Sequence, residues 1–233
     1  MLKGGFPKGR MILVRGTPGM GKTILASQFL HHGACQGERG LFISLEESKE
    51  QFIREMYFVG MDFRQKEKED LITFIDASPI RHIPGEVKLG EVRVGKRDFA
   101  LVALVKKIKN TVAEKKPQRI AVDPLTALSI QYPTESELRL MVLDLIEALT
   151  QTGATCLMTE DATSSRRIED YSVHGLLLLR SLRAGSTAVK TIEIIKMREC
   201  KHDDQPRLYN ITDNGITVHP EENVLALLGS NPD

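Results

Sequence analysis

The sequence predicts an α/β fold with a mostly parallel central sheet, helices on both faces and a C-terminal antiparallel β extension. Up to about residue 161, short apolar runs alternate with stretches of helical periodicity. These runs are continuously apolar, which is typical of parallel strands buried on both faces. After residue 175 the helical periodicity ends, and strand-like runs follow one another in meander order.

Capping residues support several of the predicted boundaries. Ser48 is the predicted N-cap of a helix that ends at Gly60, and Thr134 with Glu137 forms a predicted capping box. We expect strands over residues 10–16, 40–47, 71–77, 119–125 and 154–161, and helices over 22–37, 48–60, 99–116 and 134–153. The tail strands are expected over 175–182, 189–198, 207–212 and 215–220, with a tight turn at 212–215.

Residues 79–97 break this pattern, because the stretch is rich in glycine, proline and charge. We interpret it as a mobile loop or small insertion, since the alternation of strands and helices resumes directly after it. Residues 1–233 are therefore expected to form a single domain.

The composition excludes several classes of protein. Hydrophobic residues make up 41% of the 233 residues, enough to bury a sizeable core. The net charge of +1 argues against duplex DNA as the main partner. The three cysteines have no CxxC spacing, which argues against a zinc site or a disulfide framework. No apolar run is long enough to cross a membrane, and a cytoplasmic protein is expected.

Residues 16–23, GTPGMGKT, match the phosphate-binding pattern G-x-x-x-x-G-K-[ST] between a predicted strand and a predicted helix. The glycines allow backbone N–H groups to point inward at phosphate oxygens, and the helix adds its positive end. Lys22 is expected to reach the β- and γ-phosphates, and the Thr23 hydroxyl to bind Mg²⁺. The nucleotide-binding residues expected from this motif are Gly16, Thr17, Pro18, Gly19, Met20, Gly21, Lys22, Thr23 and Ile24.

Acidic and polar residues follow other predicted strands at the edge where ligands bind in parallel sheets. Asp123 ends "RIAVD" and is the expected second Mg²⁺ ligand, although an aspartate before Pro124 can also simply begin a turn. Glu46 and Glu47 end the predicted strand 40–47 and are expected to activate water, to favour the dipole of the next helix, or both. Thr159 and Glu160 are either sensors of the γ-phosphate or ordinary strand-end residues.

Taken together, these motifs resemble the KaiC-like branch of the RecA-superfamily ATPases, including the archaeal RadA/RadB-type paralogues. The resemblance runs along nearly the whole chain outside residues 79–97. The matching stretches are "GGFPKGRMILVRGTPGMGKT", "FISLEES", "RIAVDPLTAL", "TIEIIKMRECKH" and "YNITDNGITVHP".

The resemblance implies a RecA-like P-loop NTPase fold and a homo-oligomeric ring, usually a hexamer, with ATP held between subunits. By position, residues of a neighbouring subunit would reach the nucleotide in trans. Without the resemblance, the spacing of Lys196 and Arg198 is explained by the alternation of side chains on an exposed strand face. The trans residues implied are Lys196, Met197 and Arg198 at the phosphates, His202 near the nucleotide, and Thr212 and Asp213 near the adenosine.

Two positions depart from the family pattern. Glu199 stands where the family usually has a glycine, and this places an acid near the expected phosphate clamp. His174 stands where an acidic residue is common.

The leading functional hypothesis is a Mg²⁺-dependent ATPase with a regulatory or signal-transduction role and an unknown protein partner. Two alternatives stay open. One is a recombinase-like accessory in DNA repair that binds single-stranded DNA through residues 79–97 or 166–175, although aromatic residues for base stacking are few there. The other is a non-catalytic nucleotide sensor, and autokinase activity is a weaker prospect.

Overall fold

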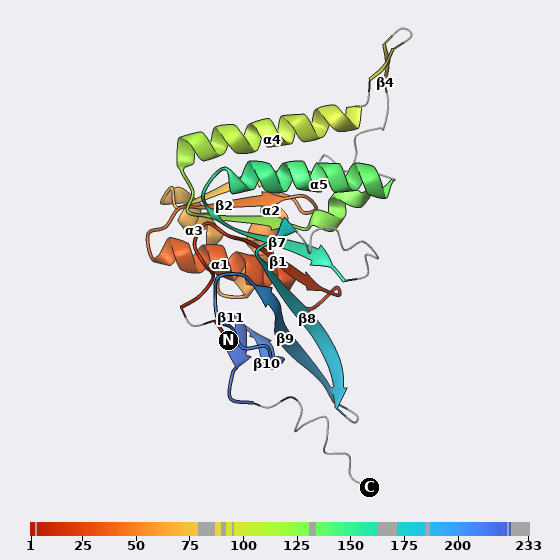
Figure 1. Ribbon diagram of the computed structural model, residues 1–233. Coiled ribbons are helices and arrows are strands. Elements are labelled where there is room, and N and C mark those ends of the chain that lie inside the picture. The colour runs from red at the N-terminus through yellow and green to blue at the C-terminus, as the bar shows by residue number, and fades with distance from the viewer. Residues whose placement is uncertain are drawn as a thin grey trace.

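The computed structural model describes residues 1–2, 4–78, 87–89, 92–94, 96–130, 134–162, 172–184, 187–222 and 224. Its centre is a nine-stranded sheet in the order β11-β10-β9-β8-β1-β7-β6-β2-β3 (Figure 1). The strands are β1 (Met11–Gly16), β2 (Gly40–Ser44), β3 (Ile72–Asp76), β6 (Arg119–Asp123), β7 (Thr155–Asp161), β8 (Gly175–Ala184), β9 (Thr187–Met197), β10 (Arg207–Thr212) and β11 (Gly215–His219).

The sheet has a parallel part and an antiparallel part, as the sequence predicts. The six strands from β8 to β3 pair in parallel, so their carboxyl ends share one edge. Strands β9, β10 and β11 continue the sheet in antiparallel order beyond β8. The predicted α/β fold with an antiparallel extension is confirmed.

Helices cover both faces of the sheet (Figure 1). Side chains of β1 alternate between the faces: Met11 and Leu13 join the core under α4 and α5, whereas Ile12 and Val14 join the core under α1, α2 and α3. The helices are α1 (Lys22–Cys35), α2 (Lys49–Phe58), α3 (Phe63–Lys68), α4 (Lys96–Lys115) and α5 (Glu135–Thr150), with a short 3₁₀ helix η2 (Leu125–Ile130).

The predicted caps are present. The Ser48 side chain accepts a hydrogen bond from the Gln51 N–H at the start of α2. Thr134 accepts from the Glu137 N–H at 3.3 Å and donates to the Glu137 carboxylate at 2.8 Å. Gly60 follows α2 with φ of 75°, a left-handed conformation that glycine adopts without strain.

Two elements were not expected. Helix α3 has the polar sequence FRQKEK and buries only Phe63, so it carries almost no hydrophobic periodicity. Within the predicted loop 79–97, β4 (Val87–Leu89) and β5 (Val92–Val94) form an antiparallel hairpin, and α4 begins at Lys96. The other residues of that segment lie outside the described part of the chain, as does most of 166–175.

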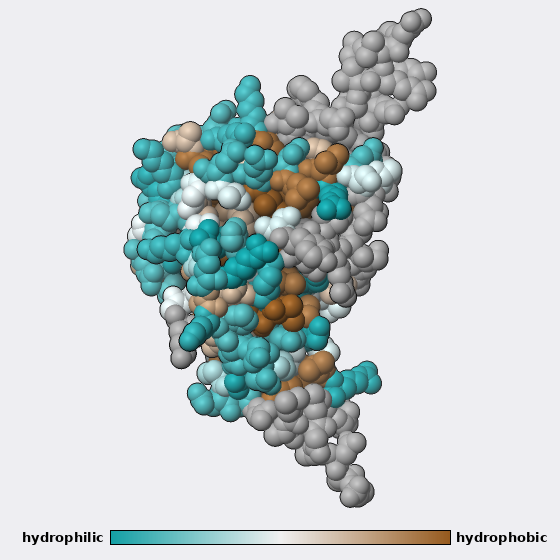
Figure 2. Space-filling model, in the orientation of Figure 1, coloured by the Kyte–Doolittle hydropathy of each residue, from teal (hydrophilic) through white to brown (hydrophobic). Residues whose placement is uncertain are grey.

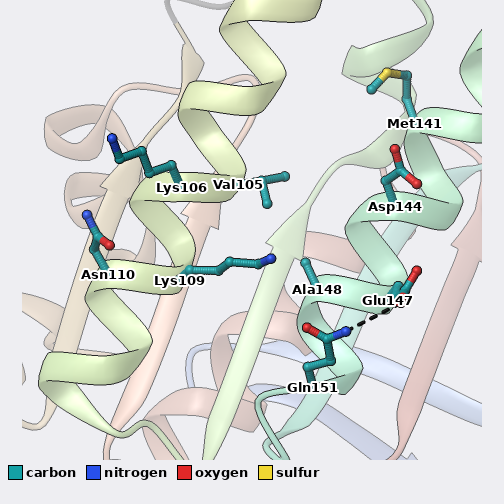
Figure 3. Close-up of a pocket in the computed structure, with 9 residues that line it drawn as sticks. All are labelled: Val105, Lys106, Lys109, Asn110, Met141, Asp144, Glu147, Ala148 and Gln151. Atoms are coloured by element: carbon teal, nitrogen blue, oxygen red, sulfur yellow. Dashed lines mark hydrogen bonds between the residues drawn. The ribbon is translucent and has the colours of Figure 1, made fainter.

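The surface is mostly polar, and Figure 2 shows hydrophilic residues over most of the described face, with separate hydrophobic patches. A groove lies between α4 and α5, where Lys109 extends from α4 toward α5 and Gln151 contacts Glu147 (Figure 3). None of the residues that line it belongs to the predicted site. Among the helices that the structure describes, none has the length and apolar character needed to cross a lipid bilayer.

Candidate functional site

The candidate site begins with the loop between β1 and α1, residues 16–23. Gly19 and Gly21 have φ of 80° and 83°, values that side chains other than glycine rarely adopt. Gly21 is the N-cap of α1 and has no side chain to cap the N–H groups of the first turn, which also lacks acidic residues. The helix therefore presents N–H donors and its positive dipole end to the loop, an arrangement that binds phosphate.

Lys22 lies largely buried beneath this loop. Its ammonium group donates to the Thr17 carbonyl at 3.2 Å and lies 2.7 Å from the Asp161 carboxylate. Only 10% of the side chain is exposed. The cation is thus held beside the phosphate-binding loop, where the motif requires it.

Thr23 and Asp123 lie together although they are 100 positions apart in the chain. The Thr23 hydroxyl donates to Asp123 Oδ2 at 2.9 Å, and Thr159 donates to Asp123 Oδ1. Burial raises the pKa of Asp123, opposed by the hydrogen bonds from Thr159 and Thr23 and by the charge of Lys22.

This pair of oxygen donors fits Mg²⁺. Mg²⁺ prefers oxygen ligands, and in nucleotide sites it uses one or two protein ligands together with phosphate oxygens. The described residues contain no group of three or more His, Cys, Asp or Glu that could hold a metal ion by themselves.

The end of β7 contacts the site through three consecutive residues. The Thr159 hydroxyl donates to Asp123, Glu160 accepts a hydrogen bond from Arg15 Nε at 2.8 Å, and Asp161 pairs with Lys22. The structure brings Thr159 to the expected Mg²⁺ ligand, whereas the Glu160 carboxylate contacts Arg15 of β1. Sequence reasoning missed Arg15 and Asp161, because only the pairing of β1 with β7 reveals these contacts.

Glu46 and Glu47 lie at the same edge, just beyond the end of β2. The register pairs Ser44 with Asp123, and the Leu45 N–H donates to the Asp123 carbonyl at 2.8 Å. Glu46 is exposed and Glu47 partly buried, in a turn closed by hydrogen bonds between Ser44 and the Glu47 backbone. Both carboxylates precede the N-cap Ser48, so the geometry also accommodates a favourable interaction with the α2 dipole.

The β10–β11 hairpin packs against the phosphate-binding loop of its own chain. The Tyr209 hydroxyl donates to the Met20 carbonyl at 2.6 Å, and Ile211 Cδ1 lies 2.9 Å from where a Cβ on Gly21 would stand. The Asp213 carbonyl similarly abuts Gly60 after α2. The hairpin therefore docks on the loop of its own chain through Tyr209 and Ile211, and its turn reaches Gly60 at the end of α2. Sequence reasoning missed Tyr209, since nothing in the sequence indicates this docking.

Lys196, Met197 and Arg198 lie at the opposite end of the strands, where the parallel strands β1 and β8 begin. We call this end the second edge. Met197 pairs with Gly175, which in turn pairs with Ile12, four residues before the loop begins. At about 3.3 Å per residue, the end of β9 is at least about 13 Å from its own loop. His202 belongs to the same region, where it forms a β-bridge with Leu2.

The two departures from the family pattern meet at this second edge. Glu199 adopts φ of 62°, a left-handed conformation that explains why a glycine suits the position. Its carboxylate pairs with Arg10 of the same chain. The Arg198 N–H donates to the His174 carbonyl at 2.9 Å, which fixes the backbone at the end of β9. The Glu199 carboxylate is therefore paired with Arg10 of its own chain.

Comparison with known proteins identifies the family. The family model described as "ATPase: KaiC" matches residues 1–223. The chain belongs to the KaiC family of ATPases. The circadian clock oscillator protein KaiC of Rippkaea orientalis is 33% identical over 93% of this chain, and that of Synechococcus elongatus is 31% identical over the same share. The chain spans 41% of the length of each of these relatives.

A solved KaiC-like structure has the same fold. The KaiC-like protein of the hyperthermophilic archaeon Pyrococcus horikoshii superposes with a TM-score of 0.80 at 29% identity, covering 94% of this chain and 93% of that one. The match confirms the RecA-like fold, and this protein is a KaiC-family ATPase domain.

Proposed function

We propose that this KaiC-family domain binds ATP with Mg²⁺ at residues 16–24 and hydrolyses it. One observation carries the proposal. The Thr23 hydroxyl and the Asp123 carboxylate lie 2.9 Å apart, next to Lys22 and to a loop whose N–H groups converge at a helix start. Acidic, hydroxyl and cationic groups in this arrangement suit a metal-bound polyphosphate.

Each residue of the loop region has a defined task. The backbone N–H groups of the loop hold the phosphates, and Lys22 contacts the β- and γ-phosphates. Thr23 and Asp123 hold Mg²⁺, and Thr159 orients Asp123 through its hydrogen bond. When bound, Mg²⁺ neutralises phosphate charge and so lowers the barrier to attack on the γ-phosphorus.

Glu46 and Glu47 orient the attacking water and accept its proton. Glu46 is exposed at the same edge as Asp123, so it is accessible to water, and its charge acts on Asp123. A carboxylate in this position contributes general-base catalysis and water orientation.

The position of the second edge supports assembly into a homo-oligomeric ring, expected to be a hexamer. Lys196 and Arg198 are too far from their own loop to contact its nucleotide, and we infer that they face a nucleotide held by a neighbouring subunit. Cations supplied in trans stabilise charge in phosphoryl transfer. For Thr212 and Asp213 we keep the role that the resemblance implies, contact with the adenosine part of a nucleotide bound by the neighbouring subunit.

We further propose that the ATP cycle serves a regulatory or signal-transduction role with a protein partner. Circadian clock names among the relatives support this class of function. The segments considered for single-stranded DNA lie mostly outside the described residues, so no described contact favours that alternative.

Calorimetry with ATP and Mg²⁺ tests the proposal. The wild-type chain is expected to bind ATP, and Lys22→Ala is expected to weaken binding at least about 100-fold, because a largely buried cation is lost. Lys116→Ala, which removes a cation beyond the end of α4, is the matched control and should bind as wild type does. Absence of binding to the folded wild-type chain would contradict the proposal.

A further inference from the structure

Lys22, the lysine of the phosphate-binding motif, already has a counter-ion in its own chain. The Lys22 ammonium lies 2.7 Å from Asp161 Oδ1, and the two side chains are 10% and 26% exposed. This pair is sheltered from water, so its attraction is stronger than that of a surface ion pair. A phosphate group that reaches Lys22 must therefore either share this lysine with the Asp161 carboxylate or displace the carboxylate from it.

Asp161 is anchored where it can compete with phosphate. It is the last residue of β7, and the β-ladder places it beside Gly16, the first residue of the phosphate-binding loop. Its own N–H donates to the Thr126 hydroxyl at 2.9 Å, and the next N–H, of Ala162, donates to the Gly16 carbonyl at 3.1 Å. The backbone on both sides of the carboxylate is thus fixed to the loop and to η2.

We propose that Asp161 is a specificity-determining residue that competes with the phosphates of the nucleotide for Lys22. This inference rests on the proposed function, because it assumes that the loop binds ATP. The β- and γ-phosphates carry enough charge to displace a single carboxylate, whereas a monophosphate does not extend to Lys22. Asp161 therefore lowers the affinity for polyphosphates and leaves the affinity for AMP unaffected.

Two other roles of Asp161 predict the opposite effect. If Asp161 bound Mg²⁺, loss of its charge would weaken binding of Mg²⁺ and ATP together. If it held Lys22 in the orientation that phosphate requires, its loss would weaken binding of every polyphosphate. The sign of the change in affinity therefore separates competition from both roles.

The test is calorimetry on the whole chain, comparing wild type with Asp161→Asn. We expect the variant to bind ATP with Mg²⁺, and inorganic tripolyphosphate without Mg²⁺, about tenfold more tightly. AMP should bind as it does to wild type. The gain should shrink at high salt, because the effect is one of charge.

Three variants complete the experiment. Asp161→Glu keeps the charge and should retain affinity close to that of wild type, and Asp161→Ala should repeat the gain if the asparagine variant folds poorly. Glu38→Gln removes a carboxylate of similar exposure from its ion pair with Arg119, and should leave ATP binding unchanged. Unchanged or weaker ATP binding by folded Asp161→Asn would overturn the inference. The proposed function would still stand in that case, provided that the wild-type chain binds ATP. A wild-type chain that did not bind ATP would overturn both.

Discussion

The two edges of the parallel sheet differ in what a single chain provides. At the carboxyl edge, Lys22, Thr23 and Asp123 contact one another or the loop directly, so one chain supplies together the groups that we propose to bind phosphate and Mg²⁺. At the opposite edge, Lys196 and Arg198 lie at the end of β9, far from any phosphate-binding loop of their own chain. The difference teaches that one edge gathers the groups of the proposed nucleotide site, whereas the other edge lies too far from its own loop to contribute to that site.

Arg198→Ala is expected to give the largest effect on turnover. Loss of a cation supplied in trans should lower ATP hydrolysis about a thousandfold in the assembled protein, by analogy with arginine fingers. ATP binding by the isolated chain should be almost unchanged, because this residue lies at the other edge. Phosphate-release assays above and below the assembly concentration measure the effect, and Arg64→Ala on α3 is the control. An equal loss of activity in dilute, unassembled protein would show that the two edges are not separate.

The carboxylates after β2 sharpen the comparison within the first edge. Glu46→Gln combined with Glu47→Gln should lower turnover about 100-fold and spare ATP binding, because only water activation is removed. Single-turnover phosphate release and calorimetry together measure the two properties. Glu50→Gln, in the first turn of α2, is the matched control. Normal turnover in the double variant would remove both carboxylates from the mechanism.

Much of the first edge could be predicted from the sequence, because its groups are encoded locally. The pattern of residues 16–23 specifies a strand, a nest of N–H groups and a helix start within one short stretch. Asp123 was predictable because a buried strand ends there, and parallel strands bring their carboxyl ends together.

Contacts between strands were not predictable. The pairs of Arg15 with Glu160 and of Lys22 with Asp161 depend on β1 lying next to β7 in one particular register, and opposite charges far apart in a sequence have many candidate partners. Helix α3 was missed because its single turn-and-a-half buries one side chain. The position of the β10–β11 hairpin depends on the docking of Tyr209 and Ile211 against Met20 and Gly21, which only the fold reveals.

Glu199→Gly tests how the left-handed backbone at the second edge affects the free energy of unfolding. Glycine should relieve left-handed strain of about 1 kcal/mol, and loss of the exposed pair with Arg10 should cost about 0.5 kcal/mol. The variant should therefore be slightly more stable in urea unfolding. Glu199→Gln loses the pair but keeps the strain, so it should be slightly less stable than wild type. A large destabilisation by glycine would mean that the ion pair, and not the backbone, determines this turn.

The smallest effect is expected from pH. Burial, with Arg10, Arg198 and Lys196 nearby, lowers the pKa of His174 from 6.5, while Glu199 opposes the shift. Because the folded pKa lies below the unfolded value, the contribution of His174 to stability is present above pH 6.5 and is lost as the pH falls through the folded pKa. Melting temperatures of His174→Gln should therefore depend less on pH below 6.5 than those of wild type. A steeper dependence in the variant would reverse the assigned sign.

Mixing two inactive variants tests most directly whether the two edges form one site between subunits. Lys22→Ala lacks the phosphate-binding lysine of the first edge, and Arg198→Ala lacks the cation of the second edge. Each variant alone should therefore be nearly inactive. Randomly mixed in equal amounts within rings, they should recover about a quarter of the wild-type rate of phosphate release, since one interface in four combines two intact edges. A mixture no more active than its two components would contradict the account.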